Sequence, residues 1–361
     1  MKSAGRGTAC RIARRYNNRM PTRSPANPIL RPQDVPPSRP GYEVIGALNA
    51  AAARLGDETL LLVRVVERPI NPDPDVYIAP VYDPAAGKLE LKRFPKGAPG
   101  YDFSDPRGII APEGHYLTGI SHLRLARSRD GVHFEVEAAP ALFPADEYET
   151  FGVEDPRVTP IGDEFYVTYV AVSRLGIVTR LARTRDFHSF ERLGVIFPPD
   201  NKDVVLFPEK IGGKYYALHR PSTSGLGRPE IWLAESPDLL DWGHHRHLIG
   251  TRSNGWEDVR LGAGAPPIKT PYGWLEIYHG ANRDNRYSLG MLLLDLDEPG
   301  RVLARSQQPI FAPEAEYERQ GFFGNVVFTC GALLEGNKVR VYYGAADTCM
   351  ALAEFSLEEL I

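Results

Sequence analysis

Three segments that are versions of one pattern decide the fold: Leu125-Ala-Arg-Ser-Arg-Asp-Gly131, Leu181-Ala-Arg-Thr-Arg-Asp-Phe187 and Leu233-Ala-Glu-Ser-Pro-Asp-Leu239. Looser versions begin at Ile78, Leu292 and Leu352, so successive copies start 47, 56, 52, 59 and 60 residues apart. A repeat of this length indicates that one supersecondary unit is used several times. The five intervals predict five units.

A second repeated element is a turn glycine followed by an aromatic and β-branched strand. It occurs at Gly162-Asp-Glu-Phe-Tyr-Val-Thr-Tyr169, Gly213-Lys-Tyr-Tyr-Ala-Leu-His-Arg220, Gly273-Trp-Leu-Glu-Ile-Tyr-His-Gly280 and Gly336-Asn-Lys-Val-Arg-Val-Tyr-Tyr343, and more loosely at Gly56. The 361 residues include 34 glycines and 32 prolines, close to one residue in five, which favours many short strands joined by turns over long helices.

Together these repeats predict an all-β protein, specifically a five-bladed β-propeller. The alternative is a β-sandwich, whose strands have no reason to repeat at 50 to 60 residues. We expect one catalytic domain over residues 29–361, preceded by a disordered or extended basic tail over residues 1–28. Lys2, Arg6 and Arg11 are among the basic residues of that tail, and no apolar signal core follows them.

The charge balance gives no reason to expect nucleic acid or a membrane surface as a partner. There are 42 Lys and Arg against 46 Asp and Glu, a formal net charge of −4, and no apolar stretch reaches the length of a membrane span. Cys10, Cys330 and Cys349 are too few and scattered for a disulfide framework or a metal knuckle, so a cytoplasmic protein is expected. Cys330 and Cys349 are interpreted as small buried residues. A homo-oligomer is left open.

In a propeller, equivalent residues of different blades meet at a central channel. Asn49 and Asp155 each lie seven residues before a turn glycine, so they should share one rim of the channel. The same counting puts the histidines at 219 and 279 on the strand face that carries Arg64. Asp155 precedes Pro156, which fixes the backbone, and burial can raise the pKa of such a carboxyl group until it serves as a general acid. The alternative is a turn in which Asp155 accepts backbone hydrogen bonds and Arg157 pairs with Glu154.

Four cationic candidates fall in successive units: Lys202, Arg220, Arg260 and His279. Each alone is more often a surface charge or a satisfied histidine, but in one channel beside a carboxylate they predict a pocket for an anion such as phosphate. A metal is not expected, because neighbouring arginines would repel it.

Several motifs together resemble the β-mannoside phosphorylases of glycoside hydrolase family 130. They are Phe151-Gly-Val-Glu-Asp-Pro-Arg157, Phe207-Pro-Glu-Lys210, His219-Arg-Pro221, Trp274-Leu-Glu-Ile-Tyr-His-Gly280, Tyr287-Ser-Leu-Gly290 and Tyr342-Tyr-Gly-Ala-Ala-Asp347, with Asn49 and Arg64. The resemblance runs from about residue 29 to the end. It implies a five-bladed propeller that splits a β-mannosidic bond with inorganic phosphate, its co-substrate, and releases α-mannose 1-phosphate with inversion.

The resemblance also implies roles for single residues. Asp155 matches the family's proton donor, which acts through a sugar hydroxyl. Asn49, Arg64 and Asp347 match residues that hold the mannose. The positions that match phosphate contacts are Arg220, His279 and Tyr287, with Lys202 and Arg260, where the family pattern has Arg and Lys respectively. That exchange keeps the charge and changes the fork geometry. Ala50 stands where some members have a small polar residue or proline.

In an inverting phosphorylase, phosphate is the nucleophile, so one protein carboxylate suffices and Asp155 alone need be essential. Two other readings stay open: an inverting hydrolase, which needs a second channel carboxylate to activate water, and a non-catalytic glycan-binding propeller. Asp258 is the second candidate acid, because Gly255 to Arg260 repeats the spacing of Gly152 to Arg157. The acceptor sugar and linkage depend on variable loops and are not predicted.

Overall fold

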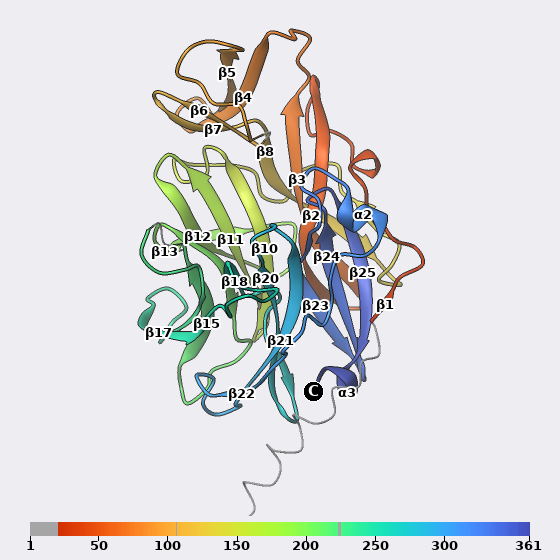
Figure 1. Ribbon diagram of the computed structural model, residues 1–361. Helices are drawn as coiled ribbons and strands as arrows, with labels where there is room; N and C mark the ends of the chain where they lie inside the picture. The colour runs from red at the N-terminus through yellow and green to blue at the C-terminus, as the bar shows by residue number, and fades with distance from the viewer. Residues whose placement is uncertain (1–20, 106, 223–224) are drawn as a thin grey trace, which may run out of the picture.

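The computed structural model describes residues 21–105, 107–222 and 225–361, and almost all of its regular structure is β-strand (Figure 1). Its helices are single turns at Pro32–Asp34 (η1), Glu316–Arg319 (α2) and Leu357–Leu360 (α3). Within the described part of the chain, no helix is long and apolar enough to cross a membrane. The all-β prediction is confirmed.

The strands pair in successive antiparallel groups along the chain. The first group is β2 (Tyr42–Leu55), β3 (Glu58–Pro69), β8 (Ile120–Ser128) and β9 (Glu135–Val136); the next is β10 (Gly152–Ile161), β11 (Glu164–Ser173), β12 (Gly176–Thr184) and β13 (Glu191–Phe197). A parallel contact between Gly152 and Ser121 joins these two groups into one sheet.

Three further sheets complete the order. The first contains β14 (Asn201–Leu206), β15 (Tyr215–Pro221), β16 (Ile231–Ser236) and β17 (Gly243–Ile249). The second contains β18 (Arg260–Gly262), β19 (Ile268–Thr270), β20 (Gly273–Ala281), β21 (Tyr287–Leu294) and β22 (Val302–Arg305). The third contains β23 (Val327–Glu335), β24 (Lys338–Ala345), β25 (Cys349–Ser356) and β1 (Thr22–Arg23). The five-bladed propeller stays a prediction, because the pairing describes separate sheets and no closed ring.

The repeated leucine segment is the third long strand of each group. Leu125 lies on β8, Leu181 on β12 and Leu233 on β16, and the looser copies lie on β21 and β25. All three leucines are fully buried, which explains why the pattern recurs. The copy at Ile78 was a wrong match: it lies on β4 (Val76–Asp83), in an insertion, because its alternating apolar residues serve an unrelated hairpin equally well.

That insertion joins β3 to β8, which pair directly with each other. It contains two hairpins, β4 with β5 (Lys88–Pro95) and β6 (Gly108–Ala111) with β7 (Gly114–Leu117), which stand at the top of Figure 1. Its own small aromatic core includes Phe94, whose ring lies 4.9 Å from that of Tyr116, and packs against Phe151 just before β10. The insertion is therefore anchored to the second strand group.

The N-terminal boundary differs from the expected one. Residues 1–20 of the expected tail, with Cys10, lie outside the described residues. Residues 21–28 belong to the last sheet: Thr22 and Arg23 pair with β25, and Asn27 Nδ2 donates to the carbonyl of Leu352 at 2.9 Å. The folded part thus begins before residue 29, because the outer edge of β25 offers unpaired backbone groups to this segment.

Buried tyrosine–glutamate–arginine clusters pin the segments that lead into inner strands. Glu149 accepts hydrogen bonds from Tyr169 (2.8 Å) and Arg180 (2.7 Å). Equivalent clusters form around Glu257, with Tyr278 and Arg305, and around Glu318, with Tyr343 and Arg23. All three glutamates are fully buried, so each segment is held by charge-assisted hydrogen bonds.

Cys330 and Cys349 are buried free thiols, as predicted.

Candidate active site

One pocket of about 650 Å³ collects side chains from every strand group. Its lining includes most of the residues that the sequence singles out: Asn49, Arg64, Asp155, Lys202, Arg220, Arg260, Tyr287 and Asp347. These residues are separated by up to about three hundred positions in the chain, and the converging inner strands bring them together. The predicted meeting of equivalent positions is therefore observed.

Backbone bulges aim three of the pocket residues. Asn49, Asp155 and Asp203 each have a positive φ, of 48°, 45° and 55°. Each is the first extra residue where the inner strand shifts its register against the next strand. A bulge re-aims a side chain, and Asn and Asp tolerate this left-handed conformation better than most residues. The three side chains thus occupy equivalent positions in successive groups.

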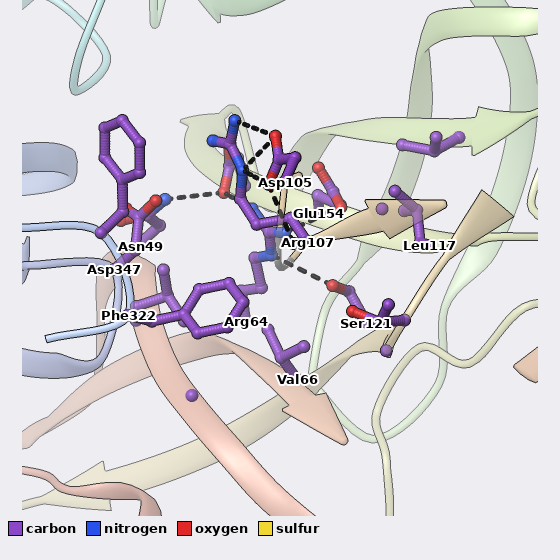
Figure 2. A pocket seen from close by; sticks show the side chains of 18 of the residues that line it. Asn49, Arg64, Val66, Asp105, Arg107, Leu117, Ser121, Glu154, Phe322 and Asp347 are labelled. Carbon is purple, nitrogen blue, oxygen red and sulfur yellow. Dashed lines mark hydrogen bonds and ion pairs between the residues drawn. The ribbon is translucent and has the colours of Figure 1, made fainter. Parts of the chain in front are cut away.

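Arg64 on β3 binds residues of the acid side of the pocket, which is the part lined by Asn49, Ser121, Glu154 and Asp155 (Figure 2). Its guanidinium donates to Glu154 Oε1 at 2.7 Å, to Asp155 Oδ1 at 3.0 Å and to Ser121 Oγ at 3.2 Å. Asn49 Nδ2 donates to the same Asp155 oxygen at 2.9 Å. Asn49 and Asp155 therefore share one rim, as the spacing predicted, and Asp155 is bound by side chains instead of backbone amides.

The charges around Arg64 set the protonation of this side of the pocket. Burial would raise the pKa of Asp155, but Arg64, Arg157, Asn49 and Lys202 outweigh it, and the pKa of Asp155 is lowered. Burial raises the pKa of Asp347 to about 6, against the opposing charge of Arg64. In the free protein Asp155 is thus ionised at neutral pH, and Asp347 is the more readily protonated carboxylate.

Lys202, Arg220 and Arg260 also line the pocket, and the part that they line is called the cation side below. Among residues 21–105, 107–222 and 225–361, neither Lys202 nor Arg260 has a carboxylate within 4 Å, although Arg260 Nη1 donates to the Tyr287 hydroxyl at 3.1 Å. Arg220 Nη1 lies 3.1 Å from Asp203 Oδ2. This side of the pocket therefore carries positive charge that is not fully neutralised by the protein.

Asp203 and Arg157 are site residues that the sequence interpretation did not assign. Asp203 is 2% exposed and lies among Arg220, His279 (Nε2 at 3.3 Å) and Arg157 (Nη2 at 3.1 Å). Arg157 also donates to the carbonyl of Gly264 and so ties inner strands together beneath the pocket. His279 is fully buried behind Asp203, so its direct contact with an anion stays a prediction. Counting from turn glycines missed Asp203 because its hairpin is longer.

One alternative and one expectation about neighbouring side chains were wrong. Glu154 pairs with Arg64 and not with Arg157. His219 faces away from the pocket and stacks on Phe197, while its neighbour Arg220 lines the pocket. In both hairpins the residue that lines the pocket is the eighth after the turn glycine: Arg64 after Gly56, and Arg220 after Gly212. The count for His219 began one residue later, at Gly213, and therefore assigned the wrong face of the strand to the pocket.

Asp258 does not line the pocket. Its carboxylate lies 3.3 Å from Arg283 Nε, a largely exposed side chain. The preceding Glu257 binds Tyr278 as Glu149 binds Tyr169, so Gly255 to Arg260 corresponds to the anchoring segment before an inner strand and not to its bulge. The repeated Glu-Asp spacing is therefore coincidental, and Asp258 lies outside the candidate active site.

The insertion forms one wall of the pocket. Arg107, just before β6, is held by Asp105, and its guanidinium lies 4.8 Å from the ring of Phe323, which belongs to the loop before β23. Ile110 and Tyr116 also line the pocket. The insertion and the loop before β23 thus contact each other where both line the pocket.

Among the residues that the structure describes, no group of three or more His, Cys, Asp or Glu side chains is arranged to hold a metal ion. Charged partners of the pocket carboxylates are arginines and a histidine. The donor set therefore suits an anion next to a polyhydroxylated ligand, since arginine, lysine and amide groups bind both.

Comparison with known proteins agrees with this chemistry. A family model described as β-1,4-mannooligosaccharide phosphorylase, of glycoside hydrolase family 130, matches residues 115–361. The chain is 50% identical over 339 residues to a β-1,2-mannobiose phosphorylase of Listeria innocua serovar 6a, covering 93% of this chain and 96% of the relative. It is 41% identical over 254 residues to a 1,2-β-oligomannan phosphorylase of Thermoanaerobacter sp., covering 70% and 84%.

The fold comparison gives the same result. The structure of the β-1,2-mannobiose phosphorylase from Listeria innocua in complex with β-1,2-mannobiose superposes with a TM-score of 0.92 at 50% identity, over 94% of this chain and 98% of that chain. The family model covers well over half of the sequence, and the two curated relatives match over 96% and 84% of their own length. The protein therefore belongs to glycoside hydrolase family 130.

Proposed function

We propose that the protein is an inverting β-mannoside phosphorylase, which cleaves a β-mannosidic bond with inorganic phosphate to give α-mannose 1-phosphate. One observation carries the proposal: the same pocket holds a buried acid, Asp155, and two cations, Lys202 and Arg260, that lack a carboxylate partner among the described residues. The relatives that share up to half of the sequence are named as β-mannoside phosphorylases, which supports the same reaction.

The mannose unit is bound on the acid side. Asn49, Arg64 and Asp347 offer amide, guanidinium and carboxyl groups around Asp155, which suit sugar hydroxyls that both donate and accept. Phosphate is bound on the cation side by Lys202 and Arg260, with Arg220, His279 and Tyr287 around them. The two ligands then meet at the anomeric carbon of the mannose.

Phosphate binding also prepares the acid. Lys202 is one of the groups that lower the pKa of Asp155 in the free pocket. A phosphate anion next to Lys202 offsets this positive charge and adds a negative one, and both effects favour protonation of Asp155. The enzyme thus gains its acid only when its nucleophile is present.

The reaction is a single displacement. A phosphate oxygen forms a bond to the anomeric carbon on the face opposite the leaving group, while the glycosidic carbon–oxygen bond breaks. The proton of Asp155 passes to the leaving oxygen, through a sugar hydroxyl as in the family, and the configuration inverts once. One protein carboxylate is sufficient.

A hydrolase is the second candidate, because the pocket holds more than one carboxylate. Glu154 is held in an ion pair with Arg64. Arg220, His279 and Arg157 lower the pKa of Asp203 despite its burial, so Asp203 is a weak base. Asp347, with its pKa raised to about 6, is the group that water activation would have to use. The unneutralised Lys202 and Arg260 favour phosphate over water in this position.

The insertion favours a short substrate. Arg107 and Phe323 contact each other where both line the pocket, and Ile110 and Tyr116 line it as well. A disaccharide fills a pocket of about 650 Å³ better than a long chain does. We infer that β-1,2-mannobiose, the substrate in the name of the relative from Listeria innocua, is used here.

We also infer that the strand groups form the five blades of a propeller. The eight-stranded sheet divides at the single parallel contact between Gly152 and Ser121 into two antiparallel groups, which with the three other sheets of four or five strands make five units. The pocket receives inner-strand residues from all of them, which is the arrangement expected at a propeller axis.

The test is an activity panel with inorganic phosphate. β-1,2-Mannobiose, β-1,4-mannobiose and mannosyl-glucose are incubated with the protein, and α-mannose 1-phosphate is measured by anion chromatography. The proposal expects this product from at least one mannoside, with β-1,2-mannobiose the fastest. No mannose 1-phosphate from any of them would overturn the proposal.

A further inference from the structure

Asp203 is a carboxylate in the part of the pocket that is otherwise built for an anion. It lines the pocket together with Lys202, Arg220 and Arg260. An oxyanion drawn to these cations must therefore lie near a carboxylate of the same sign. Such a neighbour is costly unless a proton lies between the two oxygens.

The orientation of the Asp203 carboxylate is fixed. Its Oδ1 accepts a hydrogen bond from Arg157 Nη2, and its backbone is held at the bulge of β14. A Cβ atom built on Gly262 would lie 2.1 Å from Asp203 Oδ2, so the carboxylate is packed directly against this glycine. This contact and the hydrogen bond from Arg157 hold the carboxylate in place.

The second oxygen of Asp203 retains accepting capacity. Oδ2 is near Arg220 and His279, but it makes no hydrogen bond of acceptable geometry within the described part of the chain. Burial would raise the pKa of Asp203, yet Arg220, His279 and Arg157 lower it, so the group is an ionised acceptor. A ligand hydroxyl that donates to Oδ2 would satisfy it.

Inorganic phosphate at neutral pH carries at least one P–OH group, whereas sulfate carries no proton. A short O–H···O⁻ hydrogen bond to a buried carboxylate is favourable, while an unprotonated oxygen in that place is repelled. We propose that Asp203 selects protonated oxyanions such as phosphate over unprotonated ones such as sulfate by accepting a hydrogen bond from the P–OH group. The inference rests on the proposed function, because it takes phosphate as the ligand of the cations.

This selection also orients the nucleophile. The P–OH group donates a hydrogen bond to Asp203 and keeps its proton. The phosphate oxygens that carry negative charge therefore face Lys202, Arg260 and the anomeric carbon. Asp203 thus acts as a specificity-determining and positioning residue, and it neither gives nor takes a proton during the displacement.

The test measures anion binding by calorimetry without sugar, so it does not depend on catalysis. Phosphate, arsenate, sulfate and monofluorophosphate, which resembles phosphate but has no hydroxyl above its last pKa, are titrated into the wild type. Phosphate and arsenate should bind tenfold to a hundredfold more tightly than sulfate and monofluorophosphate, the size expected for one hydrogen bond to a charged group. Similar affinities for all four anions, or no phosphate binding, would overturn the proposal.

Asp203→Asn tests the residue itself, because it keeps an oxygen for Arg157 and removes the charge. The preference for phosphate over sulfate should fall about tenfold or more. If Asp203 served only to neutralise Arg220 and Arg157, both anions would gain affinity equally and the ratio would not change, which would contradict the proposal. Asp258→Asn, a buried carboxylate outside the pocket, is the control and should retain the wild-type ratio.

If the protein forms mannose 1-phosphate but does not prefer phosphate to sulfate, the phosphorylase function stands and only the role of Asp203 is refuted. If it prefers phosphate but forms no mannose 1-phosphate, the proposed function is refuted and the anion selectivity stands. If Asp203→Asn does not fold, the comparison of phosphate with monofluorophosphate on the wild type still decides.

Discussion

Replacing Asp155 with asparagine should abolish most of the phosphorolysis and leave the fold intact. The amide keeps the oxygen that accepts hydrogen bonds from Asn49 Nδ2 and Arg64 Nη1, at 2.9 and 3.0 Å. It cannot supply the proton that the leaving sugar needs. A general acid contributes roughly 10²- to 10⁴-fold to the rate, or about 3–5 kcal/mol in the activation free energy.

The effect on stability should be much smaller. Two hydrogen bonds to a charged acceptor become hydrogen bonds to a neutral one, a loss of about 1–2 kcal/mol, partly offset because one buried charge is removed. Arg64 keeps Glu154 as its ion-pair partner at 2.7 Å. We therefore expect the melting temperature to change by only a few degrees while kcat falls by two orders of magnitude or more.

The assay measures initial rates of α-mannose 1-phosphate formation at saturating β-1,2-mannobiose and phosphate, together with the melting temperature. Asp258→Asn is the matched control, because Asp258 is a buried aspartate outside the pocket, and its rate should be that of the wild type. Residual activity of Asp155→Asn within a few-fold of wild type would refute its role as the acid. Loss of folding in the variant would refute the view that its contacts survive the substitution.

Three other changes probe separate parts of the account. Lys202→Met should raise the KM for phosphate about tenfold or more with little effect on the KM for the mannoside, because only the anion loses a charged contact; equal changes in both would contradict this. Asp347→Asn should stabilise the protein by up to about 3 kcal/mol near pH 8 and hardly at all near pH 4. The reason is that the folded protein raises the pKa of Asp347 to about 6 from 3.8, so ionising this carboxyl group costs stability as the pH rises through that range. Melting curves of both proteins at several pH values measure this effect, and a larger stabilisation near pH 4 than near pH 8 would contradict the prediction. Glu149→Ala should destabilise the protein by about 1–3 kcal/mol, because the buried Tyr169 hydroxyl loses its acceptor while Arg180 keeps only Asp146 as a carboxylate partner. An unchanged melting temperature would count against the anchoring role.

The sequence predicted the strand repeat and the meeting of Asn49 with Asp155. Both residues precede hairpins of the same length, at Gly56 and Gly162, so counting back from the turn glycine finds equivalent bulges. The hairpin after β14 is longer, and Asp203 lies ten residues before Gly213, so the same count failed there. A search for an Asp or Asn before the start of each repeated strand, with a variable turn length, would have found it.

The insertion and the N-terminal edge strand were beyond the sequence pattern. The segment at Ile78 has the alternation of a blade strand, and only the direct pairing of β3 with β8 identifies it as part of an inserted hairpin. Thr22 and Arg23 carry no strand signal of their own; their pairing depends on the open edge of β25. Such contacts depend on tertiary context, which local propensity does not contain.

The most direct test of the central claim is the dependence of cleavage on phosphate. β-1,2-Mannobiose is incubated with the protein in phosphate-free buffer and again with phosphate added, and free mannose and mannose 1-phosphate are measured separately. The account predicts almost no cleavage without phosphate, and with phosphate equal amounts of mannose and α-mannose 1-phosphate. Rapid release of two mannose molecules per disaccharide in the absence of phosphate would contradict it and favour a hydrolase that uses Asp347 as its base.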